Sequence, residues 1–154
     1  MGVILFGLFG SSAVFYYHTK ASIPHFYSLH SWLGILTWFF FTTQFVSGFV
    51  AYLFPGLSFT FRSLMMPFHR ACGVGTFLAA SATCLTGLNE KAIFAFKDPP
   101  YSQLPAGGIA ANILGFLIVA FVSVVVYLVT KPEYIRREKP EEQVIRLNFD
   151  LDEN

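Results

Sequence analysis

The sequence has few charged residues: Asp, Glu, Lys and Arg make up only 12% of its 154 residues. A soluble domain carries about twice that share, roughly 25%. The 10 basic and 9 acidic residues nearly balance, and the net charge of +1 excludes nucleic-acid binding driven by a general basic charge. Hydrophobic residues reach 55%, so too few polar residues remain to cover a globule. We therefore expect lipid to surround most of the chain.

Cysteine is scarce as well, and the two cysteines, Cys72 and Cys84, lie in one uncharged run. On a single helix their spacing corresponds to roughly 18 Å, at a rise of about 1.5 Å per residue. A disulfide needs Cα atoms within about 7 Å, so the sequence predicts no bond between them. The cysteines therefore give no indication of the redox compartment.

The chain does contain long stretches without charge, and a membrane-spanning helix needs about 20 mostly apolar residues. These stretches predict an all-α, multi-pass transmembrane helical bundle of about four helices, at residues 1–17, 27–54, 66–88 and 107–130. The first helix is short and has the character of a membrane helix whose upstream part is missing. We expect residues 1–130 to form the membrane domain and the polar residues 131–154 to form a disordered tail.

Basic residues outside the helices predict the orientation, because cytoplasmic segments carry an excess of Lys and Arg. Arg62, in the predicted 55–65 loop, lies on the same side as the basic tail. The opposite side carries three lysines that acidic neighbours partly offset. We therefore predict a cytoplasmic tail, with the 18–26 and 89–106 loops on the non-cytoplasmic side.

Two of the four histidines fall inside predicted membrane helices. His30 lies about one turn into the second helix, and His69 lies about one turn into the third from the opposite side. Placing an ionisable side chain within a membrane span costs free energy, so such residues are candidates for functional sites by default. His18 and His25 fall in the predicted non-cytoplasmic loop. His25 has no assigned role.

The sequence around the two membrane histidines repeats as His-x3-Gly-x13-Gly, offset by 39 residues. Positions i+4 and i+18 return to the same face of a helix as position i. The two copies comprise His30, Gly34 and Gly48, and His69, Gly73 and Gly87. Because the two helices run antiparallel, the far glycine of each is predicted to lie near the depth of the other's histidine.

A haem is a flat plate whose iron takes axial imidazoles, and small residues beside the ligand make room for it. One such plate in each leaflet could pass electrons across the bilayer. Small residues are also routine where membrane helices pack together. A membrane histidine is equally compatible with a hydrogen-bonded core residue or a proton-relay group.

Residues 27–34, YSLHSWLG, resemble the Ser-Leu-His-Ser-Trp-x-Gly signature of the cytochrome b561 family. Further similarities follow in the family's order, and the resemblance extends to about Pro132. They are found at residues 54–56 with 61–63, 67–69, 87–91 and 111–115. The most similar group is the ascorbate-dependent reductases of animal vesicles, lysosomes and plasma membranes. The chain therefore resembles the C-terminal part of a six-helix cytochrome b561 core.

This resemblance implies an ascorbate-dependent transmembrane oxidoreductase with two b-type haems, each held by two histidines. Electrons would pass from cytoplasmic ascorbate to a non-cytoplasmic acceptor, either monodehydroascorbate or ferric ion. His30 would be an iron ligand of the outer haem and His69 of the cytoplasmic haem. Arg62 matches a basic residue near cytoplasmic ascorbate, and His18 matches a histidine of the outer substrate pocket. The family also implies a homodimer.

The family's first two helices have no counterpart in this sequence. The histidines that should face His30 and His69 are absent with the missing segments, so each haem keeps one protein ligand. The alternative function is a non-catalytic membrane protein that has lost stable haem binding and associates with full-length partners. A third possibility is a small transporter or scaffold. The lack of Asp or Glu inside any predicted span counts against ion-coupled transport.

Overall fold

The computed structural model describes residues 2–53, 57–134 and 143–144, and within these ranges it contains α-helices and no strand. The helices are α1 (Gly2–Lys20), α2 (Leu29–Gly48), α3 (Phe59–Ala95) and α4 (Ala106–Thr130). Short helical segments follow α2, α3 and α4: the π-helix η1 (Phe49–Leu53) and the 3-10 turns η2 (Tyr101–Gln103) and η3 (Pro132–Tyr134). The predicted all-α helical bundle is confirmed. Most of the predicted tail, and residues 54–56, lie outside the described residues.

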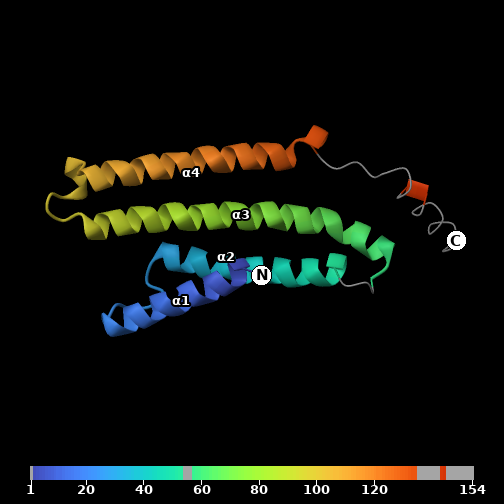
Figure 1. Ribbon diagram of the computed structural model, residues 1–154, viewed down its shortest axis with the longest axis horizontal. Coiled ribbons are helices and arrows are strands. Elements are labelled where there is room, and N and C mark those ends of the chain that lie inside the picture. Colours follow the sequence, from blue (N-terminus) through green and yellow to red (C-terminus); the bar gives the residue numbers. More distant parts are fainter. Residues whose placement is uncertain (1, 54–56, 135–142, 145–154) are drawn as a thin grey trace.

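Helices α2, α3 and α4 lie side by side, with α3 between the other two (Figure 1). Helix α1 crosses α2 at an angle, and the indole of Trp38 joins them. The Trp38 Nε1 donates to Ser11 Oγ at 2.9 Å. Gly7 leaves the space for this indole, because a Cβ atom there would come within 2.3 Å of the ring. At the far end of the bundle, Arg70 Nη2 donates to the carbonyl of Val129, which ties α3 to the end of α4.

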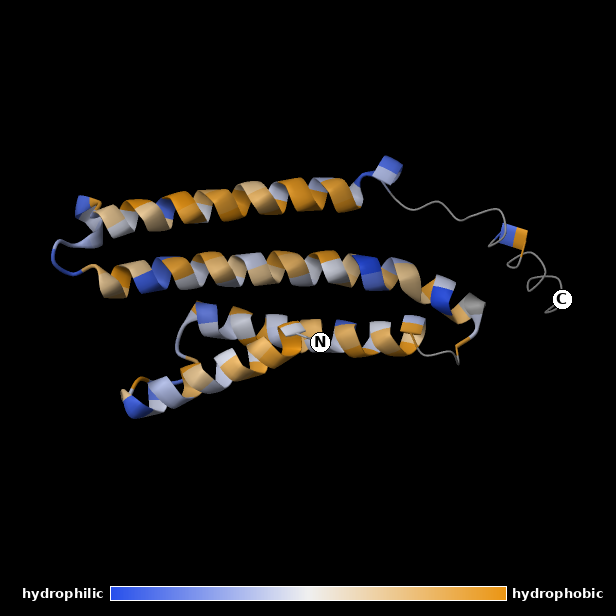
Figure 2. Cartoon of the chain, viewed as in Figure 1, coloured by the Kyte–Doolittle hydropathy of each residue, from blue (hydrophilic) through white to orange (hydrophobic). Residues whose placement is uncertain are grey.

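Three helical segments are long and apolar enough to cross a membrane: Leu29–Leu53, Phe61–Ala95 and Ala106–Thr130. Helix α1 is not among them, so the fourth predicted span stays a prediction. Apolar residues cover the surface of the helices (Figure 2), and large ones such as Phe6, Trp32 and Phe116 are exposed. This surface fits a hydrocarbon solvent, in which backbone groups must bond within each helix.

Helix α3 is longer than the predicted 66–88 at both ends. Ser58 caps its start, where the Ser58 Oγ accepts from the Phe61 N–H at 3.3 Å. The prediction that Arg62 lies in a 55–65 loop is therefore wrong, because Arg62 lies inside α3. Glu90 and Lys91 also belong to α3. At about 1.5 Å per residue α3 is roughly 55 Å long, well beyond a hydrocarbon core of about 30 Å, so its charged ends can extend into water.

Helix α1 ends in a reversal that turns the chain back toward α2. Ile23 N–H donates to the His18 carbonyl at 2.9 Å, and Ser22 N–H donates to the Thr19 carbonyl at 3.4 Å. These bonds have the pattern of a Schellman motif, which places one residue in the left-handed conformation. That residue is Ser22, with φ of 53°. Glycine is the usual residue there, because it lacks the Cβ atom that makes this conformation costly.

We expect Ser22→Gly to stabilise the protein by about 1 kcal/mol, because it removes the left-handed strain of a residue with a Cβ atom. The measurement is thermal unfolding in detergent. Ser28 is the matched control, since it has an extended backbone and its side chain caps α2. Ser28→Ala should destabilise by about 1 kcal/mol. Equal effects of the same sign at both positions would contradict this account.

Candidate functional site

The two membrane histidines each lie against a glycine of the other helix. A Cβ atom on Gly87 of α3 would come within 2.6 Å of His30 Cε1 on α2. A Cβ atom on Gly48 of α2 would come within 2.9 Å of His69 Cε1 on α3. The cross-helix pairing predicted from the repeated spacing is therefore confirmed. The imidazoles themselves occupy the space above the two far glycines.

The two imidazoles lie near opposite ends of the α2–α3 pair. His30 is in the first turn of α2, whereas the glycine against His69 is the last residue of α2. Their spacing along α2 corresponds to about 27 Å at roughly 1.5 Å per residue. Both histidines are half-buried. The arrangement therefore has one imidazole toward each end of the same helix pair.

A backbone carbonyl of α3 holds the His30 ring in place. His30 Nδ1 lies 3.0 Å from the Thr83 carbonyl oxygen. A carbonyl can only accept, so Nδ1 carries the hydrogen and the Nε2 lone pair is available to a metal. Metal-bound histidines commonly donate their other ring nitrogen in this way. Thr83 also contacts Gly34, whose Cβ position lies 3.5 Å from the Thr83 methyl group.

His69 is oriented by Tyr52, a residue of the π-helical segment η1. The two rings meet edge to face, with centroids 5.6 Å apart and an interplanar angle of 66°. The Tyr52 hydroxyl donates to the Arg62 carbonyl at 3.3 Å. Short π-helical segments are frequent at functional sites. The sequence did not predict the contact of Tyr52 with His69, because a π-helix has no readable sequence signal here.

There is open space beside His69 on its own helix. Nothing lies within 4 Å of the Cβ position of Gly73, which is one turn along α3 from His69 on the same face. Within the part of the chain that the structure describes, neither ring nitrogen of His69 has a hydrogen-bond partner. A flat group could therefore approach the imidazole from this side.

Arg62 lies in the first turn of α3, at the His69 end of the bundle. Its Nε atom is buried and has no hydrogen-bond partner among the described residues. Buried polar groups are almost always hydrogen-bonded, so an unpaired guanidinium nitrogen calls for a ligand or water. An anion suits a guanidinium, which recognises carboxylates and similar groups through several donors.

The two remaining histidines come together at the opposite end. His18 belongs to the last turn of α1 rather than to a loop, and its ring stacks on that of His25. Nearby, Tyr27 donates to Glu90 Oε1 at 3.1 Å, which joins the start of α2 to α3. Desolvation and the Glu90 carboxylate raise the pKa of Tyr27. The sequence predicted neither the His18–His25 contact nor the Tyr27–Glu90 contact.

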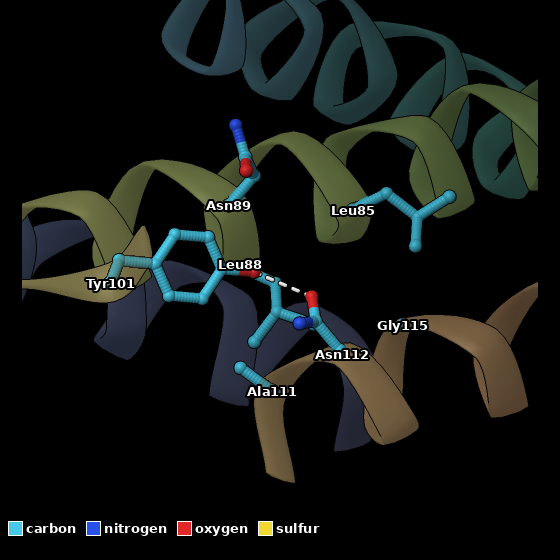
Figure 3. Close-up of a pocket in the computed structure, with 7 residues that line it drawn as sticks. All are labelled: Leu85, Leu88, Asn89, Tyr101, Ala111, Asn112 and Gly115. Atoms are coloured by element: carbon cyan, nitrogen blue, oxygen red, sulfur yellow. Dashed lines mark hydrogen bonds between the residues drawn. The ribbon is translucent and has the colours of Figure 1, made fainter. Parts of the chain in front are cut away.

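A small cavity of about 110 Å³ lies between α3 and α4 (Figure 3). The Tyr101 hydroxyl donates to Asn112 Oδ1 across it. None of the four histidines or Arg62 lines this cavity. Its lining comprises Leu85, Leu88, Asn89, Tyr101, Ala111, Asn112 and Gly115. It is therefore separate from the histidine sites.

The exposed cysteines are free: Cys72 and Cys84 form no disulfide, as predicted. No group of three or more His, Cys, Asp or Glu residues that could hold a metal ion is found among the described residues. A conventional protein-only metal centre is thus not present in that part of the chain.

Comparison with known proteins gives the family. The family model described as "Eukaryotic cytochrome b561" matches residues 1–95. A transmembrane ascorbate-dependent reductase of Sus scrofa is 42% identical over 142 residues, covering 92% of this chain and 56% of the relative. A plasma membrane ascorbate-dependent reductase of Xenopus laevis is 41% identical over 140 residues, covering 91% of this chain and 48% of the relative. The chain thus spans about half the length of the curated relatives that it matches. Together with the three long apolar helical segments, these relatives identify a multi-pass membrane protein.

Proposed function

Because this chain belongs to the eukaryotic cytochrome b561 family, we propose that it carries electrons across a membrane. The donor is cytoplasmic ascorbate, and the acceptor on the other side is monodehydroascorbate or ferric ion. The observation that supports this most directly is the pair of imidazoles near opposite ends of α2 and α3, each against a glycine of the other helix. An acceptor and a donor on opposite sides of a bilayer require redox groups at two depths.

Haem b fits these residues. The Thr83 carbonyl leaves Nε2 of His30 free for iron, and the open Cβ position of Gly73 leaves room beside His69. A bound haem supplies one-electron chemistry at its iron. His30 and His69 would each supply one imidazole ligand to a haem iron. The predicted homodimer stays a prediction.

Within this arrangement, Thr83 fixes the tautomer of His30, and Gly87 and Gly48 set how closely each ring approaches the neighbouring helix. Tyr52 links the His69 ring to the backbone of Arg62. Arg62, with its unpaired buried Nε, binds the ascorbate monoanion. The end of the bundle with Arg62 and the basic tail faces the cytoplasm, because cytoplasmic segments carry the excess of Lys and Arg.

The test is a reduced-minus-oxidised spectrum of the purified 154-residue chain in lipid nanodiscs, with haem quantified per polypeptide and ascorbate as the reductant. We expect haem to be retained and to be reduced by ascorbate. A chain that retains no haem would overturn the proposal and would support the alternative of a non-catalytic membrane protein.

We expect Arg62→Ala to raise the ascorbate concentration for half-maximal haem reduction by at least about tenfold, with haem content unchanged. A hydrogen bond to a charged group contributes about 1.5–3 kcal/mol, which corresponds to this range. The measurement is the reduction rate as a function of ascorbate concentration. Arg70→Ala is the control, because Arg70 lies two turns further along α3 and bonds to the end of α4. Unchanged ascorbate kinetics in Arg62→Ala would show that Arg62 does not bind ascorbate, and that it only contributes to the excess of basic residues on the cytoplasmic side.

A further inference from the structure

We propose that the hydroxyl residue directly before each far glycine is a positioning residue for the opposing histidine. These residues are Thr86, before Gly87, and Ser47, before Gly48. Each hydroxyl controls whether the histidine ring can donate to a backbone carbonyl, and that bond sets how strongly the imidazole donates electrons to iron. The effect on a haem rests on the proposed function, whereas the hydrogen-bonding network rests only on the contacts between α2 and α3.

The Thr83 carbonyl is open to His30 because Gly87 has no side chain. In an α-helix the carbonyl of residue i points toward residue i+4, whose Cβ atom tilts back toward it. Gly87 is four residues after Thr83, and His30 Nδ1 stands 2.8 Å from the position that a Gly87 Cβ atom would take. The ring fills that place and bonds to the Thr83 carbonyl at 3.0 Å. The far glycine therefore exposes an acceptor in addition to making space for the ring.

Thr86 competes with His30 for this carbonyl. Its Oγ1 atom lies 3.0 Å from the Thr83 carbonyl oxygen and 2.8 Å from the Ala82 carbonyl oxygen. A hydroxyl has a single hydrogen, so it divides its bonding between the two carbonyls. The shorter distance is to Ala82, which leaves the Thr83 carbonyl available to the imidazole. Thr86 thus weakens the His30 bond without replacing it.

Ser47 has the corresponding place on α2, and there the hydroxyl takes the carbonyl. Its Oγ atom donates to the Gln44 carbonyl at 3.3 Å, and Gln44 precedes its far glycine by four residues, as Thr83 does on α3. Among the described residues, neither ring nitrogen of the opposing His69 has a hydrogen-bond partner. Its Nδ1 stands 3.7 Å from the Cβ position of Gly48, further out than Nδ1 of the histidine at the other site. The two sites therefore share one layout but differ in which group uses the carbonyl.

The bond to the carbonyl changes the imidazole as a ligand. An imidazole whose other ring nitrogen donates to an acceptor is more basic toward a metal. A more basic ligand stabilises ferric over ferrous iron, and hydrogen bonding around the ligands is one of the ways in which proteins set the potential of a haem. Removing either hydroxyl frees a carbonyl for one histidine. It should therefore lower the potential at that site and leave the other site unchanged.

The network is tested first on the full chain in nanodiscs without haem, by nuclear magnetic resonance of nitrogen-15-labelled histidine. Ser47→Ala should produce a new hydrogen-bonded Nδ1 proton signal, which the Ser47→Ala/His69→Gln double variant should lack. Thr86→Val should slow exchange of the His30 Nδ1 proton with water by about threefold or more, within the range of one hydrogen bond. The absence of both changes would overturn the inference.

Two matched controls remove a hydroxyl of the same kind away from the far glycines. The Thr43 hydroxyl on α2 and the Ser81 hydroxyl on α3 each donate to a carbonyl of their own helix four residues earlier. Among the described residues, neither of those carbonyls accepts from a histidine. Thr43→Val and Ser81→Ala should therefore change neither imidazole proton. Equal changes in the controls would show a general effect of removing hydroxyls and would overturn the inference.

Redox titration of the haem-loaded chain separates this inference from the proposed function. Ser47→Ala should lower the midpoint potential of the signal that His69→Ala removes, and Thr86→Val that of the signal that His30→Ala removes. We expect a change of about threefold in the reduction equilibrium, which is roughly 28 mV at about 59 mV per tenfold for one electron. Normal haem reduction with unshifted potentials, or equal shifts of both signals in either variant, would sink this inference alone. The expected proton signals in a chain that retains no haem would support the network and sink the proposed function.

Discussion

Replacing Gly87 with valine is expected to displace the His30 ring and to remove one of the two haem signals, while the other is retained. A Cβ atom on Gly87 would stand 2.6 Å from His30 Cε1 and 2.8 Å from Nδ1, far inside normal contact. The clashing atoms belong to a side chain, so the helices can keep their packing and the imidazole has to move. Its bond to the Thr83 carbonyl would then be lost, and with it the fixed position of the free nitrogen.

The matched substitution on the other helix should have the mirror effect. Gly48→Val pushes on His69, since a Cβ atom at Gly48 would lie 2.9 Å from His69 Cε1, and it should remove the second signal instead. Gly75→Val is the control, because Gly75 is on α3, is exposed, and has nothing within 4 Å of its Cβ position. Haem content and redox titration measure the result. Loss of both signals in either variant, or equal loss in Gly75→Val, would show a general packing effect.

The cross-helix pairing of histidines and glycines could be predicted from the sequence because it depends only on helix periodicity. A spacing of 18 residues returns to the same face after five turns. Two copies on neighbouring antiparallel helices must then bring each histidine to the depth of the other's far glycine. The structure adds that the ring itself packs on that glycine. The spacing alone did not distinguish this contact from a gap left for a cofactor.

The features that sequence reasoning missed depend on backbone geometry rather than on hydropathy. The sequence analysis placed both ends of α3 too far inside the helix, because it took charged residues such as Arg62 and Glu90 as the start of loops. A membrane helix can continue beyond the bilayer into water, and α3 does so on length. Ser58, as a helix cap, was the signal that could have placed the start. The Tyr52 contact depends on a π-helical segment, and the approach of His25 to His18 depends on a left-handed serine. Neither has a signature in the pattern of apolar residues.

We expect His30→Ala and His69→Ala each to abolish transmembrane electron transfer completely, although each variant should keep one haem signal. The reason is that the two imidazoles lie near opposite ends of one helix pair, about 27 Å apart along α2, so the electron passes the two sites in series. Loss of either site interrupts the route, whereas ligand binding at the remaining site depends on different residues: Thr83 and Gly87 for His30, Tyr52 and Gly48 for His69.

The measurement uses sealed vesicles with ascorbate on the Arg62 side and a membrane-impermeant ferric chelate on the other side. His69→Ala should prevent ascorbate from reducing the remaining haem, because the histidine near Arg62 is the one removed. His30→Ala should still permit that reduction but should not reduce the chelate. His25→Ala is the histidine control: its haem spectrum should be unchanged, and so should haem reduction by ascorbate. Equal loss of both haem signals in either ligand variant would mean that the histidines do not hold separate redox groups, and unchanged electron transfer would mean that they hold none.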